Sequence, residues 1–340
     1  MVHNVRAITG ERHVVAYSLL TPERWSGRMS LAVQGRLFTI PLRTDKVINV
    51  AAVTHRSPFR YPGGKTWLVP HVRTWLTSLS EKPLEFAEPF AGGAIVGLSV
   101  LFEALAEKLT LVELDEDIGA VWRVVLSNDS RRLTKMITSF DVNLQSVRRI
   151  LDARPTSVLD RAFATIVRNR MQRGGIMAPG ASLMKNGENG RGLKSRWYPE
   201  TLRKRIESIS EVKDRISFIC GDGIEFLRYH SYRKDAIFFI DPPYTVAGRR
   251  LYRYPEIDHE QLFRVVSSIT SDFLMTYDNS AEIKVLARRF GFDTQEIAMK
   301  NTHHEVMSEM LIGRCLDWSR RSAARESSPQ NALAMVASQR

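Results

Sequence analysis

Short apolar runs alternate with helical patterns over most of the chain, and several of these runs end at an acidic residue. A continuous apolar run of four to eight residues is typical of a strand that is buried on both faces of a parallel sheet. We expect strands at residues 84–87, 109–113, 216–220, 236–240, 273–276 and 310–312. We expect helices at residues 67–79, 94–106 and 118–126. The pattern therefore predicts an α/β fold built from βαβ units.

The alternation of strand and helix stops at residue 123 and resumes at residue 216. Basic amphipathic helices lie between these points, with a Gly/Asn-rich stretch at residues 174–192 that is either a linker or an exposed loop that becomes ordered on a partner. We interpret residues 123–214 as an insertion within one α/β domain, whose two parts are residues 55–122 and 215–314. Residues 1–54 form an extension without a motif, with a strand pair near residues 30–42, and residues 315–340 form a flexible tail.

Positive charge is concentrated in the insertion. The net charge of the 340-residue chain is +12, and residues 123–215 hold 20 Lys or Arg against 9 Asp or Glu, a local net charge of +11. A charge excess confined to one segment is the pattern expected of a surface that neutralises phosphates. The alternative is a set of solvated helix faces. Because the rest of the chain is nearly neutral, we favour a polyanionic partner.

Cysteine content and hydropathy exclude several other classes. The two cysteines, Cys220 and Cys315, are far apart and lack the spacing of metal ligands, so we expect a reducing compartment and no metal site. No run reaches the roughly 18 uncharged apolar residues that a membrane span requires. We expect a soluble, cytoplasmic protein without a membrane partner.

The apolar run at residues 236–240 ends abruptly at Asp241-Pro242-Pro243-Tyr244. Two consecutive prolines cannot extend a sheet ladder and instead force a rigid turn, so Asp241 would lie at the carboxyl end of a buried strand. Open α/β sheets bind ligands at that end. By itself the motif is also compatible with an ordinary Pro-Pro turn next to a surface carboxylate.

Two further patterns indicate a nucleotide-like ligand. The glycines of Glu88-Pro89-Phe90-Ala91-Gly92-Gly93 follow one strand, and Glu113, or alternatively Asp115, ends the next strand about 20 residues later, the spacing at which a carboxylate binds ribose hydroxyls. The G-x-G-x-x-G diphosphate fingerprint is absent, which disfavours a nicotinamide cofactor. A third motif is the turn Tyr61-Pro62-Gly63-Gly64-Lys65, in which Lys65 is suited to pairing with a ligand carboxylate.

In order and spacing, these motifs resemble those of the Dam-like (D12 class) adenine-specific DNA methyltransferases. The resemblance extends over residues 57–312. Besides the three motifs it includes Phe59 and Arg60 before the turn, Arg168-Asn169-Arg170 with Gly174-Gly175, Cys220-Gly221-Asp222, and the segment from Glu309 to Ile312. It implies a Rossmann-like S-adenosylmethionine-dependent methyltransferase fold, with residues 55–122 binding the cofactor and residues 123–214 forming an inserted, mainly helical recognition domain. It also implies that a flipped adenine of double-stranded DNA receives the methyl group on N6.

The resemblance assigns roles by position. It implies a catalytic motif of Asp241, Pro242, Pro243 and Tyr244, and cofactor contacts from Tyr61, Lys65, Phe90, Gly92, Glu113, Asp222 and Asp241. Gly223 departs from the family, which often has an aromatic residue at this position. Candidate DNA contacts in the insertion, chosen for their chemistry, are Arg168, Asn169, Arg170, Gln172, Arg173, Lys194 and Arg196.

The chemistry requires these residue types. The lone pair of adenine N6 is delocalised into the ring, and acceptors at the Asp241 carboxylate and the Pro242 carbonyl would orient the amine and stabilise the charge that develops on nitrogen. We expect a monomer that acts without a metal, and a cognate restriction endonuclease as partner if the chain belongs to a restriction–modification pair. The alternatives are an RNA adenine methyltransferase with the same chemistry and a DNA-binding protein with a vestigial site. By the resemblance, Asp241 also disfavours cytosine-N4 and protein-glutamine substrates, because related enzymes that act on them commonly carry Ser and Asn, respectively, at this position. The recognition sequence is left open.

Overall fold

The computed structural model describes residues 30–33, 36–39, 53–60, 64–178, 180–185, 187, 190–244, 256–300 and 306–326. The chain divides into two compact units, residues 1–44 and residues 45–340. In the first unit, strands β1 (Ser30–Val33) and β2 (Arg36–Thr39) pair antiparallel, as the sequence predicted. All further elements belong to the second unit.

A seven-stranded sheet forms the centre of the second unit, in the order β5-β4-β3-β6-β7-β9-β8. The strands are β3 (Glu85–Glu88), β4 (Lys108–Glu113), β5 (Ile216–Cys220), β6 (Ala236–Ile240), β7 (Phe273–Asp278), β8 (Asp293–Lys300) and β9 (Val306–Gly313). The strands from β5 to β7 are parallel, and β9 pairs antiparallel with both β7 and β8. The predicted α/β fold is confirmed, with a mixed rather than purely parallel sheet.

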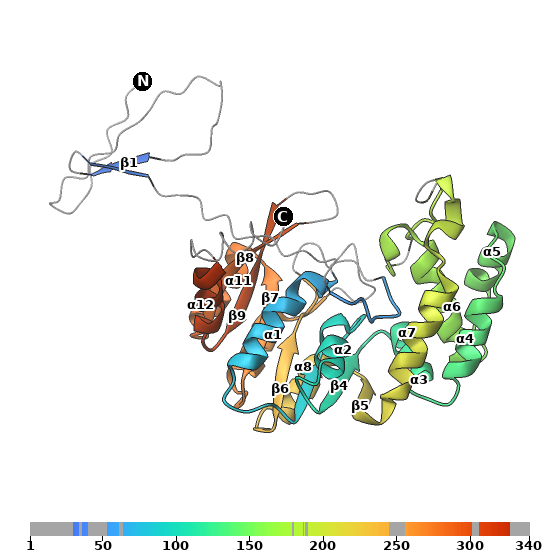
Figure 1. Cartoon of the computed structure of the whole chain (residues 1–340), viewed down its shortest axis with the longest axis horizontal. Coiled ribbons are helices and arrows are strands. Elements are labelled where there is room, and N and C mark those ends of the chain that lie inside the picture. Colours follow the sequence, from blue (N-terminus) through green and yellow to red (C-terminus); the bar gives the residue numbers. More distant parts are fainter. Residues whose placement is uncertain are drawn as a thin grey trace, which may run out of the picture. The chain divides into compact units, whose positions relative to one another are not determined.

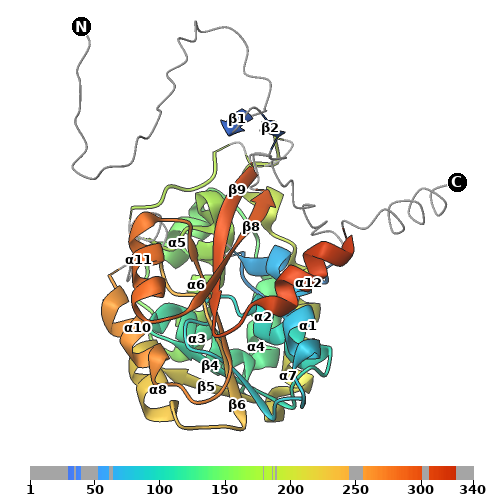
Figure 2. The same cartoon turned by 90° about the vertical axis from the view of Figure 1, so that its left-hand side faces the viewer.

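Helices cover both faces of this sheet. Figure 2 shows α1 (Val69–Ser78) and α12 (Asp317–Glu326) on one face, and α8 (Gly223–His230), α10 (His259–Ser267) and α11 (Ala281–Arg289) on the other. Side chains of β6 alternate accordingly, with Ile237 and Phe239 in one hydrophobic cluster and Phe238 and Ile240 in the other. Burial on both faces explains why β6 is apolar at every position.

Between β4 and β5 the chain is helical. Figure 1 shows these helices beyond the β5 edge of the sheet. They are α3 (Glu116–Val125), α4 (Ser130–Ser139), α5 (Leu144–Asp152), α6 (Val158–Met171), α7 (Pro199–Glu211) and the 3-10 turns η3 (Arg173–Gly175), η5 (Gly192–Arg196) and η6 (Lys213–Arg215). They share one core with α1 and α2 (Ile95–Phe102). None of the helices in the described ranges is long and apolar enough to cross a membrane.

Candidate active site

The strand order changes direction between β3 and β6. From β3 the chain proceeds outward through β4 to β5, whereas β6 lies on the other side of β3 and is followed outward by β7. Loops at the carboxyl ends of the two central strands therefore diverge, which leaves the crevice in which open α/β sheets bind ligands. The residues that follow β3 and β6 are Pro89 and Asp241. The sheet thus brings the Gly-rich motif and the Asp-Pro-Pro-Tyr motif to neighbouring positions.

Asp241 is held through one of its two carboxylate oxygens. Its Oδ1 accepts a hydrogen bond from Thr276 Oγ1 at 2.7 Å, and it lies 3.3 Å from the Tyr244 hydroxyl oxygen and 3.1 Å from Lys65 Nζ. Thr276 is in place because β6 and β7 pair in register at Ile240 and Met275, one residue earlier on each strand. Within the described ranges, the hydrogen bonds to this carboxylate all end on Oδ1. The carboxylate is therefore fixed in orientation while one oxygen remains able to accept a hydrogen bond from a ligand.

Lys65 lies between two carboxylates. It begins the short turn η2 (Lys65–Leu68), is 4% exposed, and lies 3.7 Å from Glu309 Oε1 in addition to its contact with Asp241. Burial raises the pKa of Glu309 to about 7, although Lys65 opposes the shift. Lys65 Nζ also lies 4.6 Å from the centroid of the Tyr244 ring, within the range of a cation–π interaction.

Tyr244 connects these charged groups to an aromatic stack. Its hydroxyl donates to Glu309 Oε2 at 3.0 Å, and its ring stacks on Tyr277 with 6.0 Å between ring centroids. Tyr277 is fully buried, and its hydroxyl lies 2.9 Å from His259 Nδ1. The ring of Tyr244 is thus held both at its face and at its hydroxyl.

The Gly-rich loop is bonded to the end of β4. Gly92 has a left-handed φ of 46° and donates its N–H to Glu113 Oε2 at 2.8 Å, while Glu113 Oε1 accepts from Asp115 N at 2.8 Å. Burial raises the pKa of Glu113 to about 7, and these two N–H donors oppose the shift. A carboxylate has about four acceptor positions, so the remaining ones can still accept ribose hydroxyls. Asp115, the alternative ribose ligand, instead caps helix α3 by accepting from Asp117 N.

Glu88 ends β3 with a buried carboxyl group. Its Oε1 accepts from Gly97 N at 2.9 Å, whereas its buried Oε2 has no hydrogen-bond partner in the described part of the chain. Burial raises the pKa of Glu88 to about 8. The carboxyl group is therefore largely protonated at neutral pH.

Asp222 and Gly223 begin α8 beside the Gly-rich loop. Asp222 Oδ1 caps the helix by accepting from Ile224 N and Glu225 N. A Cβ on Gly223 would lie 2.2 Å from the Pro89 carbonyl oxygen and 3.0 Å from the Phe90 ring. Only glycine fits here, which explains why no aromatic residue occupies this position. The half-buried ring of Phe90 already lies next to it.

The candidate DNA contacts differ in accessibility. Arg173 and Lys194 are exposed, Arg196 is half-buried, and Arg168 bonds to Asp117 Oδ2 at 3.1 Å. Gln172 donates to the Ala181 carbonyl. Asn169 and Arg170 are 1% and 4% exposed and bond to backbone, so the structure gives these two side chains internal contacts instead of a surface position. Tyr61, predicted to contact the cofactor, lies outside the described residues.

Four residues of the candidate active site had no role predicted from the sequence: Glu88, Thr276, Tyr277 and Glu309. Glu309 carried a usable signal, because a carboxylate within an apolar strand requires a partner. Thr276 and Tyr277 carried none, since their roles depend on how β6 and β7 pair.

A comparison with models of protein families identifies a related family. The model of the D12 class N6 adenine-specific DNA methyltransferase family matches residues 61–301. No curated protein matches the sequence.

Solved structures resemble the chain only distantly. A Pyrococcus horikoshii protein named as an RNA methyltransferase is 12% identical, with a TM-score of 0.35 and coverage of 78% of this chain and 92% of the other. The Escherichia coli protein yhhF, named as a methyltransferase, is also 12% identical, with a TM-score of 0.35 and coverage of 73% and 86%. Spermidine synthase from Thermotoga maritima is 12% identical, with a TM-score of 0.32 and coverage of 85% and 66%.

Proposed function

The chain belongs to the D12 class N6 adenine-specific DNA methyltransferase family, and on that premise we propose that it transfers a methyl group from S-adenosylmethionine to the N6 amine of adenine in duplex DNA. The observation that carries the proposal is the position of Asp241 at the switch point of the sheet. There the Oδ1 atom of its carboxylate lies in contact with Thr276, Lys65 and Tyr244.

The residues around the crevice fit S-adenosylmethionine. The buried Oε2 of Glu88 lacks a partner in the described ranges, and Gly92 has the left-handed backbone of a loop that a ligand can approach closely. We assign Lys65 to the methionine carboxylate, Phe90 and Gly92 to the methionine and ribose, Glu113 to the ribose hydroxyls and Asp222 to the adenine. Tyr61 stays a predicted contact. When bound, the cofactor supplies an electrophilic methyl group on a sulfonium.

The chain's own residues prepare the amine that accepts this methyl group. Asp241 Oδ2 and the Pro242 carbonyl would accept the two N–H bonds of N6, which favours a tetrahedral nitrogen and stabilises its developing positive charge. Pro242 and Pro243 restrict the backbone that carries this carbonyl. Tyr244 offers its ring for stacking, which would offset part of the few kcal/mol that flipping a base from a duplex costs.

The test is expression of the chain in a bacterial host that lacks adenine methylation, followed by single-molecule sequencing of the host DNA. We expect N6-methyladenine at one short sequence motif, and none with Asp241→Ala. Asp241→Ala should still bind S-adenosylmethionine in a calorimetric titration, because most of the assigned cofactor contacts remain. Methylation by Asp241→Ala would refute the assigned role.

Two rival activities give other results. An RNA adenine methyltransferase would modify structured RNA in preference to duplex DNA of matched sequence, and a vestigial site would bind DNA without methylating it. A monomeric state, a cytoplasmic location and a restriction endonuclease partner stay predictions.

A further inference from the structure

Side chains of α6 and α7 bind the backbone of residues 57–60, shortly before Lys65 in the sequence. Asn169 Oδ1 accepts from Arg60 N at 2.9 Å, and Asn169 Nδ2 donates to the Arg60 carbonyl at 2.8 Å. Arg170 Nη2 donates to the Pro58 carbonyl at 2.6 Å, and Arg205 Nη1 to the Ser57 carbonyl at 3.2 Å. Three side chains from α6 and α7 therefore hold residues 57–60, more than 100 positions earlier in the sequence.

The pair of bonds from Asn169 fixes the orientation of Arg60. A side-chain amide that binds both the N–H and the C=O of one residue acts like a neighbouring strand. Asn169 is 1% exposed and also donates to the Gly175 carbonyl at 3.1 Å, so its amide is fully committed within the protein. Buried hydrogen bonds of this kind are costly to break, because the backbone groups left behind have no water to replace the lost partner.

Gly175 completes the contact from the other side. Its φ of 75° lies in the left-handed region, and a Cβ at this position would lie 2.4 Å from the Arg60 carbonyl oxygen. The preceding Gly174 has nearly the same φ, 71°, but a Cβ there would meet only Ile176, at an ordinary distance of 3.6 Å. Close approach to Arg60 is thus a property of Gly175 alone in this pair.

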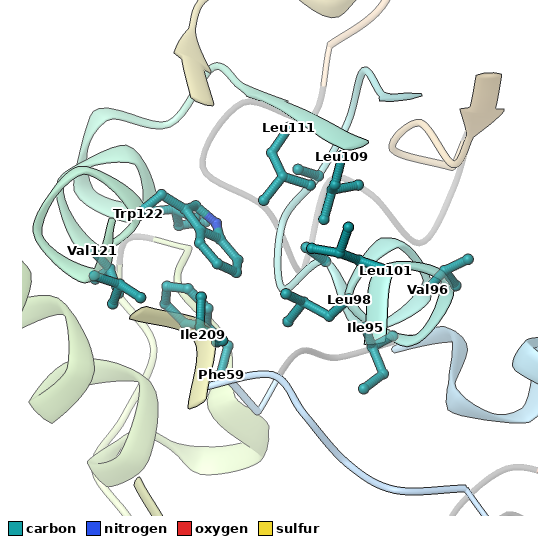
Figure 3. Close-up of a cluster of buried hydrophobic side chains, with 14 of the residues drawn as sticks. Phe59, Ile95, Val96, Leu98, Leu101, Leu109, Leu111, Val121, Trp122 and Ile209 are labelled. Carbon is teal, nitrogen blue, oxygen red and sulfur yellow. The ribbon is translucent and has the colours of Figure 1, made fainter. Parts of the chain in front are cut away.

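The held segment leads to both parts of the candidate cofactor site. Lys65 follows it in the sequence, and the fully buried Phe59 lies within it. The Phe59 ring packs against Trp122, with 6.1 Å between ring centroids, and Trp122 Nε1 donates to the Gly92 carbonyl at 2.9 Å. Figure 3 shows both rings in the cluster that they form with side chains of α2 and β4. A continuous series of contacts therefore joins Asn169 to the Gly-rich loop.

We propose that Asn169 is a positioning residue for cofactor binding. Together with Arg170 and Gly175 it holds residues 57–60. Through this segment it keeps Lys65 and the Gly92 loop in the arrangement that binds S-adenosylmethionine. The inference rests on the proposed function. Asn169 and Arg170, which were predicted to contact DNA, are instead given a role in binding the cofactor.

The first test compares Asn169→Ala with Thr165→Ala. Both residues are buried on α6, but Thr165 Oγ1 bonds only within its own helix, to the Arg161 carbonyl at 2.7 Å. Affinity for S-adenosylhomocysteine is measured by titration calorimetry at a temperature at which circular dichroism shows both variants folded. We expect Asn169→Ala to bind about tenfold more weakly than Thr165→Ala. In methylation assays the KM for S-adenosylmethionine should rise while kcat at saturating cofactor is retained.

The second test compares Gly175→Ala with Gly174→Ala, and it decides the matter if Asn169→Ala does not fold. Both changes place alanine at a positive φ and carry a similar backbone strain, so a difference in cofactor affinity reports the collision with Arg60. We expect Gly175→Ala to bind the cofactor product more weakly than Gly174→Ala, again by about tenfold.

Equal affinities within each pair, with the unmodified protein binding normally, would overturn the inference and leave the proposed function standing. Absence of binding by the unmodified protein would overturn both. A loss confined to DNA affinity in Asn169→Ala would return this residue to the DNA surface and also overturn the inference.

Discussion

At Glu88 a carboxyl group is buried without a cation, and its proton links folding to pH. The pKa is raised from 4.5 to about 8 by burial, so the folded protein retains a proton that the unfolded chain releases. For a group of this kind the free energy of unfolding is highest below pH 4.5 and falls as the pH rises toward 8. Glu113 and Glu309, with pKa values raised to about 7, act in the same direction.

Glu88→Gln should remove this dependence at one position. The amide keeps an oxygen for the Gly97 N–H and never ionises, so we expect stability at pH 9 to rise by at least about 1 kcal/mol, with little change at pH 5. Urea denaturation of both proteins at the two pH values measures the difference. The exposed Glu107→Gln serves as a control, and an equal gain at pH 5 and pH 9 would contradict the assignment.

Lys65→Met should affect two properties at once. The stem can still pack, but the positive charge beside Asp241 and Glu309 is lost. We expect affinity for S-adenosylmethionine to fall at least about tenfold, since a charge-assisted pair with a carboxylate is lost. We also expect the pKa of Glu309 to rise above 7, because Lys65 now lowers it. Calorimetric titrations across pH 6 to 8 follow both effects, and an unchanged affinity would remove Lys65 from the cofactor site.

Residues whose roles depend on local sequence could be identified from the sequence. Asp241 and Lys65 are next to prolines or glycines that mark turns in the sequence. In the structure Lys65 Nζ lies 3.1 Å from Asp241 Oδ1. Asn169 could not be assigned in this way, because nothing in the sequence of α6 shows that its amide faces Arg60, 109 residues earlier. Chemistry alone made it a candidate for reading bases.

At the scale of elements, predictions succeeded where an apolar run has clear limits. Strands β5 and β6 match their predicted limits because apolar runs define them. Strand β8 was missed, since its sequence Asp293–Lys300 mixes polar and apolar residues, as suits an edge strand. Helix α2 was expected to reach residue 106 but ends at Phe102, and Ala104 has a φ of 54°. Helices occupy much of the chain between β4 and β5, and the interpretation of residues 123–214 as an inserted recognition domain stays a prediction.

The start of α8 gives a prediction at this scale. Gly223→Ala would force a Cβ against the Pro89 carbonyl and separate α8 from the Gly-rich loop, which we expect to cost about 1–3 kcal/mol of stability and to weaken cofactor binding. Gly221→Ala is the matched control, because a Cβ there meets nothing closer than Ile219 at 3.8 Å. Thermal denaturation of the two variants makes the comparison. Equal stability of the two variants would mean that the Gly-rich loop moves away from the added Cβ without a loss of stability, and would contradict the prediction.

For the whole molecule, the distribution of charge predicts how DNA binding responds to salt. If the exposed side chains of Arg173 and Lys194 contact phosphates, each change to alanine should reduce the slope of log affinity against log salt concentration by about 0.9, without altering the methylated sequence. The exposed Lys234 lies before the amino end of β6, whereas Asp241 follows the carboxyl end of this strand. Lys234→Ala should therefore leave the slope unchanged. Fluorescence anisotropy at several salt concentrations measures all three slopes.

The contact between Asn169 and Arg60 bears on how such enzymes acquire new target sequences. Strands β4 and β5 are parallel neighbours, so the segment between them leaves the sheet at the carboxyl end of β4 and re-enters it at the amino end of the next strand. It could be exchanged as a module without changing the strand order. However, if that module also supports the cofactor site, an exchange that loses the contacts with Arg60 would weaken cofactor binding. A chimera that takes the segment from a relative must preserve the amide and glycine that meet Arg60. Substitutions that change sequence specificity would then be concentrated on the surface of the insertion. The residues that contact Arg60 would change little.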